Sequence, residues 1–211
     1  MNSAYHRRTR VPSIRDETAW FRLLHGRDMP SAEERRMILE AFDESDKYES
    51  AHEDEVVQEG GTVLTGDVLV DYHKFHFQPP SLTMIAALDT EDILRLIYLI
   101  RKWMQQPIFT QTTKDADQIG AIYPLHSQWL FALLARLDQR LSGDEIAYLR
   151  ALARTCISLI VQFRSDCARN ATIPEESSLV HESGAWIIIS IVAGVWGQQD
   201  LWTEAEQRLS L

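Results

Sequence analysis

Histidine, serine and acidic residues occur together at one place where they could support nucleophilic catalysis. His181, Glu182 and Ser183 are consecutive in "HESGAW". Neighbours along a helix point in different directions, so this spacing does not bring the three side chains together. The stretch also lacks the Gly-x-Ser-x-Gly pattern that exposes a nucleophilic serine. We therefore predict no catalytic site and no enzyme activity.

Three further groups could hold phosphate or metal, and their spacing argues against each. The stretch "EGGTVLTGD" has glycines but lacks the Lys-Ser/Thr pair of a phosphate-binding loop. His73 and His76 have no acidic or cysteine partner at metal-ligand spacing, so we interpret them as exposed loop residues. Asp89 and Asp92 in "DTED" stand where a helix begins, and capping explains them. We expect no cofactor and no metal.

The length allows one sizeable domain with extra segments, and two domains are a soft upper limit. The chain has 211 residues, 45% of them hydrophobic, and a formal net charge of −10. A protein that binds nucleic acid needs a basic surface, and this chain is acidic. A basic protein is therefore the better class of partner. The two cysteines form no pattern of pairs, which is typical of a reducing compartment. The most apolar run, residues 186–196, is about half of the roughly 20 residues a membrane span needs, so we expect no membrane partner.

The front of the chain is polar and irregular. Residues 1–15 are expected to be a basic flexible arm, and residues 16–28 a short amphipathic helix that Asp16 caps and Gly26 ends. Residues 29–78 are expected to be an acidic linker with one helix, which begins at the Ser31/Glu34 capping box. Between positions 31 and 59 there are eleven acids and three bases. That segment is either a solvated linker or an acidic patch for a basic partner.

The remainder predicts an all-α fold. We expect a bundle of four to five main helices over residues 79–203, with apolar residues at three- and four-residue steps, and a C-terminal tail over 204–211. Asp89 or Thr90 caps one of these helices, and Ser142 with Glu145 begins another. The last helix is expected from about Glu182 to Trp196. The predicted architecture is thus this helical bundle together with the short front helix and the acidic, mostly irregular linker.

Two predicted helices are apolar on nearly every side. "WLFALLARLDQRL", residues 129–141, leaves no face suited to water in its first turns, and residues 186–196 are similar. Two such helices cannot both be central in so small a bundle. The front segment, a second copy of the chain or a helix from another protein must help to cover them. Tryptophan is a typical anchor of interfaces, and Trp202, just past the last predicted helix, is a candidate for exposure.

Several of these stretches resemble one family. "WLFALLARLDQRLSGDEIAYLRALARTC" and "WGQQDLW" are similar to the helical domain of the survival motor neuron (SMN) interacting proteins, the second of the gemins. "FHFQPPSLTMIAALDTEDILRLIYLIRKWM" and "DETAWFRLLHG" resemble segments of the same family. The likeness covers roughly residues 14–28 and 75–203. The chain departs from the pattern before Asp16, where only a short arm precedes the helix, and in its long acidic segment.

The resemblance implies a non-enzymatic assembly factor of the SMN complex, in the cytoplasm and the nucleus. Family members bind a helix of the survival motor neuron protein. They also hold Sm proteins, chiefly the D-type pair through the helical domain, before the ring closes on spliceosomal small nuclear RNA. No direct sequence-specific nucleic-acid binding is expected. The runner-up is a generic helical interaction module that forms a homodimer through its apolar face.

Candidate contact residues follow from this implied function and from the two apolar helices. Those predicted to contact the SMN helix are Trp129, Leu130, Leu133, Leu137, Trp186, Ile189, Val192 and Trp196. Those predicted to contact Sm proteins are Trp20, Phe21 and Trp202.

Overall fold

The computed structural model describes residues 11–26, 28–34, 36, 78–106, 121–170 and 175–210, and every regular element among them is a helix. The all-α prediction is confirmed. The helices are α1 (Glu17–His25), α4 (Leu82–Ala86), α5 (Thr90–Met104), α7 (Pro124–Arg136), α8 (Gly143–Asn170), α9 (Glu175–Val195) and α10 (Asp200–Leu209). The basic arm at 1–10, most of the acidic segment, His73 and His76 lie outside the described residues, as does the side chain of His181.

The chain divides into two compact units. The bundle unit comprises Met1–Trp20 and Pro79–Leu211, and the short unit comprises Phe21–Gln78. In the short unit, α1 ends at Gly26, whose φ of 69° is the left-handed conformation that glycine adopts without strain. The Ser31/Glu34 capping box is confirmed, because Ser31 N donates to Glu34 Oε2 at 2.6 Å and Glu34 N donates to Ser31 Oγ at 3.1 Å.

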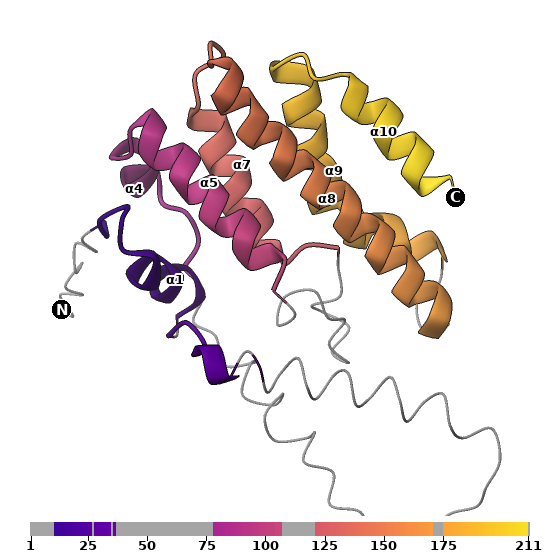
Figure 1. Cartoon of the computed structure of the whole chain (residues 1–211), viewed down its shortest axis with the longest axis horizontal. Coiled ribbons are helices and arrows are strands. Elements are labelled where there is room, and N and C mark those ends of the chain that lie inside the picture. The colour runs from indigo at the N-terminus through magenta and orange to yellow at the C-terminus, as the bar shows by residue number, and fades with distance from the viewer. Residues whose placement is uncertain are drawn as a thin grey trace, which may run out of the picture. The chain divides into compact units, whose positions relative to one another are not determined.

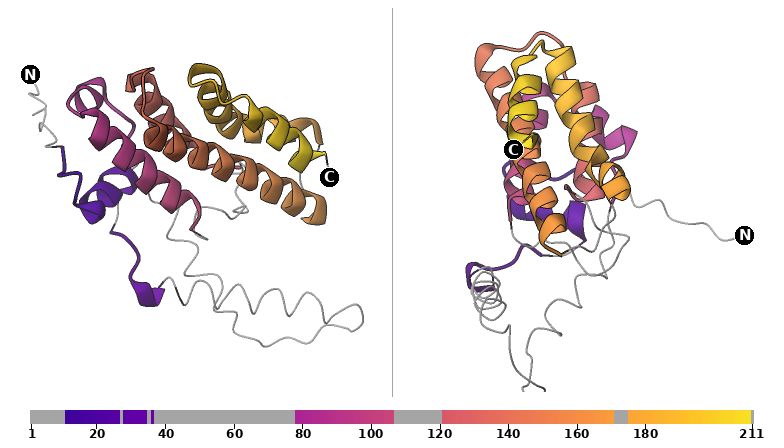
Figure 2. Two further views of the ribbon diagram at one scale, coloured as in Figure 1. Left: turned by 45° about the horizontal axis from the view of Figure 1, so that its top comes forward. Right: turned by 90° about the vertical axis from the view of Figure 1, so that its right-hand side faces the viewer.

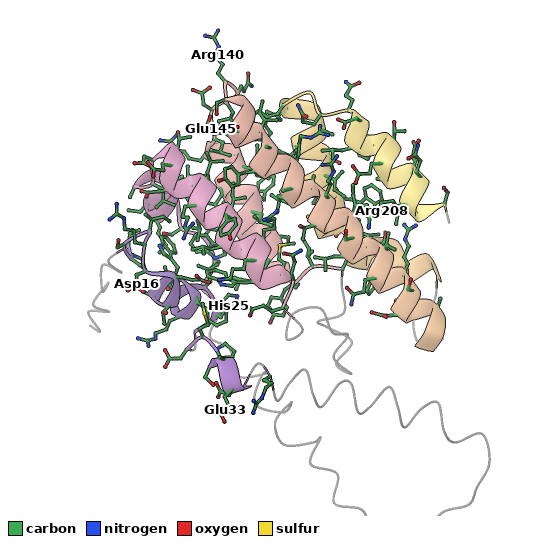
Figure 3. All side chains as sticks on the ribbon, viewed as in Figure 1. Asp16, His25, Glu33, Arg140, Glu145 and Arg208 are labelled. Carbon is green, nitrogen blue, oxygen red and sulfur yellow. The ribbon has the colours of Figure 1, made fainter. Side chains whose placement is uncertain are left out.

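Side-chain caps define where the helices of the bundle unit begin. Asp89 Oδ1 accepts a hydrogen bond from Asp92 N at 2.8 Å, as the sequence predicts. Ser142 N donates to Glu145 Oε2 at 2.7 Å, and Glu145 N donates to Ser142 Oγ at 3.3 Å. Figure 3 shows Glu145 at the start of α8. The hydrogen bonds from Ser142 lower the pKa of the Glu145 carboxyl, so the cap favours its charged form.

The helices of the bundle unit lie side by side (Figure 1). The long helix α8 packs against α5, α9 and α10, while α7 packs against α4, α5 and α9. Each of these helices turns an apolar face inward. Among the described residues the largest side chains without exposed surface include Trp103, Trp129, Ile93, Leu96 and Ile100. The core therefore forms between α5, α7, α8 and α9, with α10 added on the outside of α8 and α9.

The structure corrects two predicted helix starts and adds one helix. Helix α7 begins at Pro124, before the predicted start near His126, since proline is favoured in the first turn of a helix. Helix α9 begins at Glu175 rather than near Glu182. Helix α10 was not predicted: it includes the end of the predicted bundle, up to residue 203, and most of the predicted C-terminal tail, residues 204–211. Gly197, with a φ of 68°, turns the chain after α9, and Leu201 and Ala205 then repeat at four-residue spacing on a buried side.

One described helix meets the length and composition of a membrane span. Residues Gly143–Ala168 of α8 contain an 18-residue apolar window, of which 50% is buried within the chain. Core helices of water-soluble bundles meet the same criteria, because both environments select apolar side chains.

Candidate partner-binding surface

Helix α7 has a buried side and an exposed side, although nearly all its side chains are apolar. Trp129, Leu130 and Leu133 have no exposed surface, whereas Phe131 between them is 53% exposed. Helical geometry explains the difference, because a residue two positions from both Trp129 and Leu133 projects from another side. The expectation that this helix has no face in water is therefore wrong at Phe131.

Helix α9 also exposes apolar side chains. No charged residue occurs between Glu182 and Asp200, so the exposed side of this helix has no charge over four turns. Ile187 and Val195 are 47% and 48% exposed, and Ile191 between them is half-buried. Its buried residues, Ile188, Ile189 and Val192, project toward the core instead.

Helices α7 and α9 meet along a close seam. A Cβ atom on Gly184 would lie 3.0 Å from Ser127 Cβ and 3.3 Å from Ile122 Cγ1, so the two backbones approach where glycine provides room. Further along, Trp196 Nε1 donates to the Asp138 carbonyl oxygen at 3.2 Å. Ser127 thus lies opposite Gly184 and Asp138 opposite Trp196. The two helices therefore run in the same direction.

This seam brings the exposed apolar side chains together. Phe131 lies one turn after Ser127 on α7, and Ile187 and Ile191 lie about one and two turns after Gly184 on α9. Both helices bury their other sides in the core of the bundle, so the sides that stay exposed lie next to the seam and away from that core. We call the surface formed by Phe131, Ile187, Ile191 and Val195 the α7–α9 face. It is an uncharged apolar strip along two parallel helices, which suits an apolar side of a third helix.

The side chains predicted to contact an SMN helix lie mainly beneath this face. Those with no exposed surface are Trp129, Leu130, Leu133, Ile189 and Val192, and those with small exposed fractions are Leu137 at 8% and Trp196 at 7%. Trp186 is half-buried. The structure thus brings the two predicted helices together as the sequence analysis expected. Direct contact of these residues with a partner stays a prediction, and they support the face from within the core.

The side chains predicted to contact Sm proteins are distributed over the chain. Trp20 has no exposed surface, and its ring meets Trp129 edge-on with centroids 6.2 Å apart. Phe21, in the short unit, is buried and its ring lies 4.1 Å from that of His25. Trp202 is 38% exposed, and its ring stacks on Trp186 with centroids 6.0 Å apart. Of the three, Trp202 alone offers surface to a partner in this structure.

None of the four residues of the α7–α9 face was predicted from the sequence. Both helices are apolar on nearly every side, so the largest or most regularly spaced side chains were the candidates. Projection of each helix around its axis would have separated Phe131 from Trp129 and Leu133. The seam at Gly184, which decides which side remains open, depends on packing between segments about 57 residues apart and has no local signal.

A buried acid fixes Trp186. Glu182 has no exposed surface, and its two carboxylate oxygens accept hydrogen bonds from Arg164 Nε at 2.7 Å and Nη2 at 2.8 Å. The same carboxylate accepts a hydrogen bond from Trp186 Nε1 at 3.0 Å. The hydrogen bonds and the charge of the Glu182 carboxylate raise the pKa of the Arg164 guanidinium, which favours its charged form. The Glu182 carboxylate is thus paired with Arg164 and Trp186, so it is not available to orient a histidine as the acid of a catalytic triad.

The two cysteine thiols have raised pKa values. Burial raises the pKa of the Cys156 thiol to about 12, so the thiol stays protonated and unreactive. The pKa of Cys167 is raised as well, chiefly by burial. Within the described residues no group of three or more histidine, cysteine or acidic side chains could hold a metal ion. The surface described above is suited to binding proteins.

Comparison with known proteins identifies the family. A family model described as "Survival motor neuron (SMN) interacting protein 1 (SIP1)" matches residues 2–199. The chain belongs to the SIP1 family. The resemblance found in the sequence is thereby confirmed over nearly its full length.

Individual relatives match over shorter stretches or at lower similarity. The chain is 33% identical to Gem-associated protein 2 of Drosophila melanogaster over 98 residues, which are 44% of this chain and 36% of the fly protein. It is also similar to a chain of the solved structure "The 8S snRNP Assembly Intermediate", with 22% identity and a TM-score of 0.45. That likeness covers 90% of this chain and 78% of the other.

The SIP1 match contains the whole α7–α9 face but not α10. All four residues of the face lie within residues 2–199, whereas α10 begins at Asp200. The surface formed by α7 and α9 is therefore part of the segment that defines the family in this chain. The helix that stacks Trp202 on Trp186 lies just beyond it.

Proposed function

We propose that this SIP1-family chain is a non-enzymatic assembly factor that binds the survival motor neuron protein and Sm proteins during assembly of the spliceosomal snRNP core. Membership of a family described as SMN interacting proteins supports this proposal. The fly relative, named Gem-associated protein 2, supports it further. We also propose that the chain acts in both the cytoplasm and the nucleus.

The observation that carries the proposal is the α7–α9 face. Phe131, Ile187 and Val195 each leave about half of their surface in water, and no charge interrupts the strip on α9. A helix laid along the seam would bury these side chains, and such burial contributes about 25 cal/mol per Å² of apolar surface. We assign the helix of the survival motor neuron protein to this face. Trp129, Leu133 and Val192 would then act by holding the face rigid.

Calorimetric titration with a peptide of the N-terminal helix of the survival motor neuron protein from the same organism tests this assignment. We expect one-to-one binding with a negative heat-capacity change, which is the mark of apolar burial. The double variant Phe131→Ala/Ile187→Ala should weaken binding by about tenfold or more, because alanine removes the exposed anchors. Its thermal midpoint should stay close to that of the wild type, since both side chains are half exposed.

Tyr148→Ala is the matched control, because Tyr148 is 51% exposed but lies on α8. It should bind the peptide as the wild type does. No binding by the folded wild-type chain would refute the SMN assignment. A tight homodimer in light scattering that Phe131→Ala/Ile187→Ala dissociates would instead support the runner-up, in which a second copy covers the face.

Sm proteins, chiefly the D-type pair, form the second part of the proposal. The net charge of −10 favours a basic protein partner over nucleic acid. Trp202 is the predicted Sm-contacting side chain with exposed surface, while Trp20 and Phe21 are buried. We therefore propose that Trp202 lies at the edge of the Sm contact. Trp20 and Phe21 are buried, so they would stabilise the fold rather than touch the Sm proteins.

A further inference from the structure

Helix α10 is held on α8 mainly by polar side chains spaced four residues apart on both helices. Arg150 donates to both carboxylate oxygens of Asp200, at 2.8 and 2.5 Å, and also to Gln198. One turn later Arg154 Nε donates to Glu204 at 2.8 Å. One turn further, Arg208 Nη2 donates to Ser158 Oγ at 3.1 Å. The two helices run in the same direction (Figure 2), and Figure 3 shows Arg208 pointing from α10 toward α8.

Little apolar surface supports this attachment. Of the ten residues of α10, only Leu201 and Ala205 are buried, and Trp202 adds a stacking contact with Trp186 while remaining 38% exposed. The paired side chains are in partial contact with water, with exposed fractions of 25% for Arg150, 57% for Asp200, 49% for Arg154 and 28% for Glu204. Single exposed ion pairs stabilise weakly and are screened by salt, and the two-point Arg150–Asp200 contact is the strongest of this set.

A short connection joins α10 to α9. Only residues 196–199 separate the two helices, and Gly197 provides the turn with its positive φ. The match to the SIP1 family ends at residue 199, so α10 lies outside the segment shared with the family model. Helix α10 is therefore a short amphipathic helix that follows a glycine turn and is held largely by exposed charged side chains. Another helix can replace such a helix more readily than it can replace a core helix.

We propose that the side of α8 formed by Arg150, Arg154 and Ser158 is a docking site for acidic amphipathic helices from other proteins, with α10 as its resident occupant. We call this side the α8 basic side. An incoming helix needs acids four residues apart to meet Arg150 and Arg154, and a small or branched apolar residue next to each acid to replace Leu201 and Ala205. This site is separate from the α7–α9 face, so it stands or falls independently of the SMN assignment.

A peptide of residues 198–210 with a fluorescent label is the probe, and the full-length chain is the receptor. Anisotropy titration should show weak binding to the wild type, because its own α10 occupies the site. Glu204→Lys removes the ion pairs of Glu204 with Arg154 and Arg208 and sets a second positive charge against Arg154, so α10 is released more often. The peptide should then bind about fivefold more tightly, which is the upper end of what one exposed ion pair contributes.

Glu206→Lys is the matched control. It makes the same charge change on the same helix, but Glu206 is exposed and makes no ion pair in the described part of the chain. Peptide affinity for this variant should equal that for the wild type. Adding Arg154→Glu to Glu204→Lys re-forms the pair in reverse, and it should return peptide binding to the wild-type level or below.

Equal peptide affinity for Glu204→Lys and Glu206→Lys would overturn the proposal, as would binding that does not depend on Arg154. Hydrogen exchange on the wild-type chain gives a second test that needs no variant. Raising the salt concentration to about 1 M, where charges are screened beyond about 3 Å, should accelerate exchange of the α10 amides severalfold and leave the centre of α8 unchanged. Unchanged exchange in α10 would show that it is a fixed element and would also contradict the proposal.

Discussion

At the scale of single residues, the Glu182 carboxylate determines how part of the surface is held. It has no exposed surface, and it binds Arg164 on α8 and Trp186 on its own helix. A buried acid is costly unless its oxygens are paired, and the two-point contact with the guanidinium provides that pairing. Through Trp186 the same carboxylate fixes the ring on which Trp202 stacks.

Arg164→Met should lower the free energy of unfolding by about 3 kcal/mol, because it leaves a buried carboxylate without its cation. The side chain of Arg164 is itself 38% exposed, so we expect the lower part of the range for buried pairs. Adding Glu182→Gln removes the charge but keeps an oxygen that accepts from Trp186. The double variant should recover most of the loss in urea unfolding. Equal destabilisation of single and double variants would show that the loss comes from packing and not from the charge.

At the scale of elements, the sequence predicted the helix starts that have side-chain caps better than which side of a helix stays open. The caps at Asp89 and at Ser142 with Glu145 are local, since each joins residues three apart, and all of them form as predicted. Helix α10 was missed, because only Leu201 and Ala205 mark its buried side and its ion pairs join residues 50 apart. The α7–α9 face was missed for the same reason, since a seam between distant segments decides it.

Two glycines of α9 provide a paired test of that seam. Gly184→Ala places a Cβ 3.0 Å from Ser127 Cβ, so the side chains of Ser127 and Ile122 must shift by a few tenths of an ångström, and we expect a loss of about 1–3 kcal/mol. Gly194→Ala meets nothing within 4 Å and should gain up to about 1 kcal/mol from helix propensity. Thermal unfolding of the two variants should therefore shift in opposite directions. Similar shifts would mean that α7 and α9 are not closely packed at Ser127.

At the scale of the whole molecule, charge separates the two proposed partners. The −10 net charge acts at long range on a basic Sm partner, whereas the α7–α9 face has no charged side chain on α9. Composition alone predicted this preference for a basic partner, because net charge needs no knowledge of the fold. The location of each contact needed the structure.

The association rate with the D-type Sm pair should fall by about tenfold as salt rises from about 0.05 to about 0.5 M, since screening removes electrostatic steering. Stopped-flow or surface-based kinetics would measure it. Trp202→Ala should instead raise the dissociation rate and leave the association rate unchanged, because the indole contributes only at contact. An association rate independent of salt would remove the role proposed for the net charge.

The stacked indoles of Trp186 and Trp202 also give the chain an optical signature. With 6.0 Å between ring centroids and 11° between ring planes, their electronic transitions couple and should add a paired band to the circular dichroism spectrum. Trp20, Trp103 and Trp129 have no exposed surface and are shielded from dissolved quenchers, whereas Trp202 is reachable. Circular dichroism of the stacked pair therefore reports the position of α10, whereas the fluorescence of the buried tryptophans reports the integrity of the core.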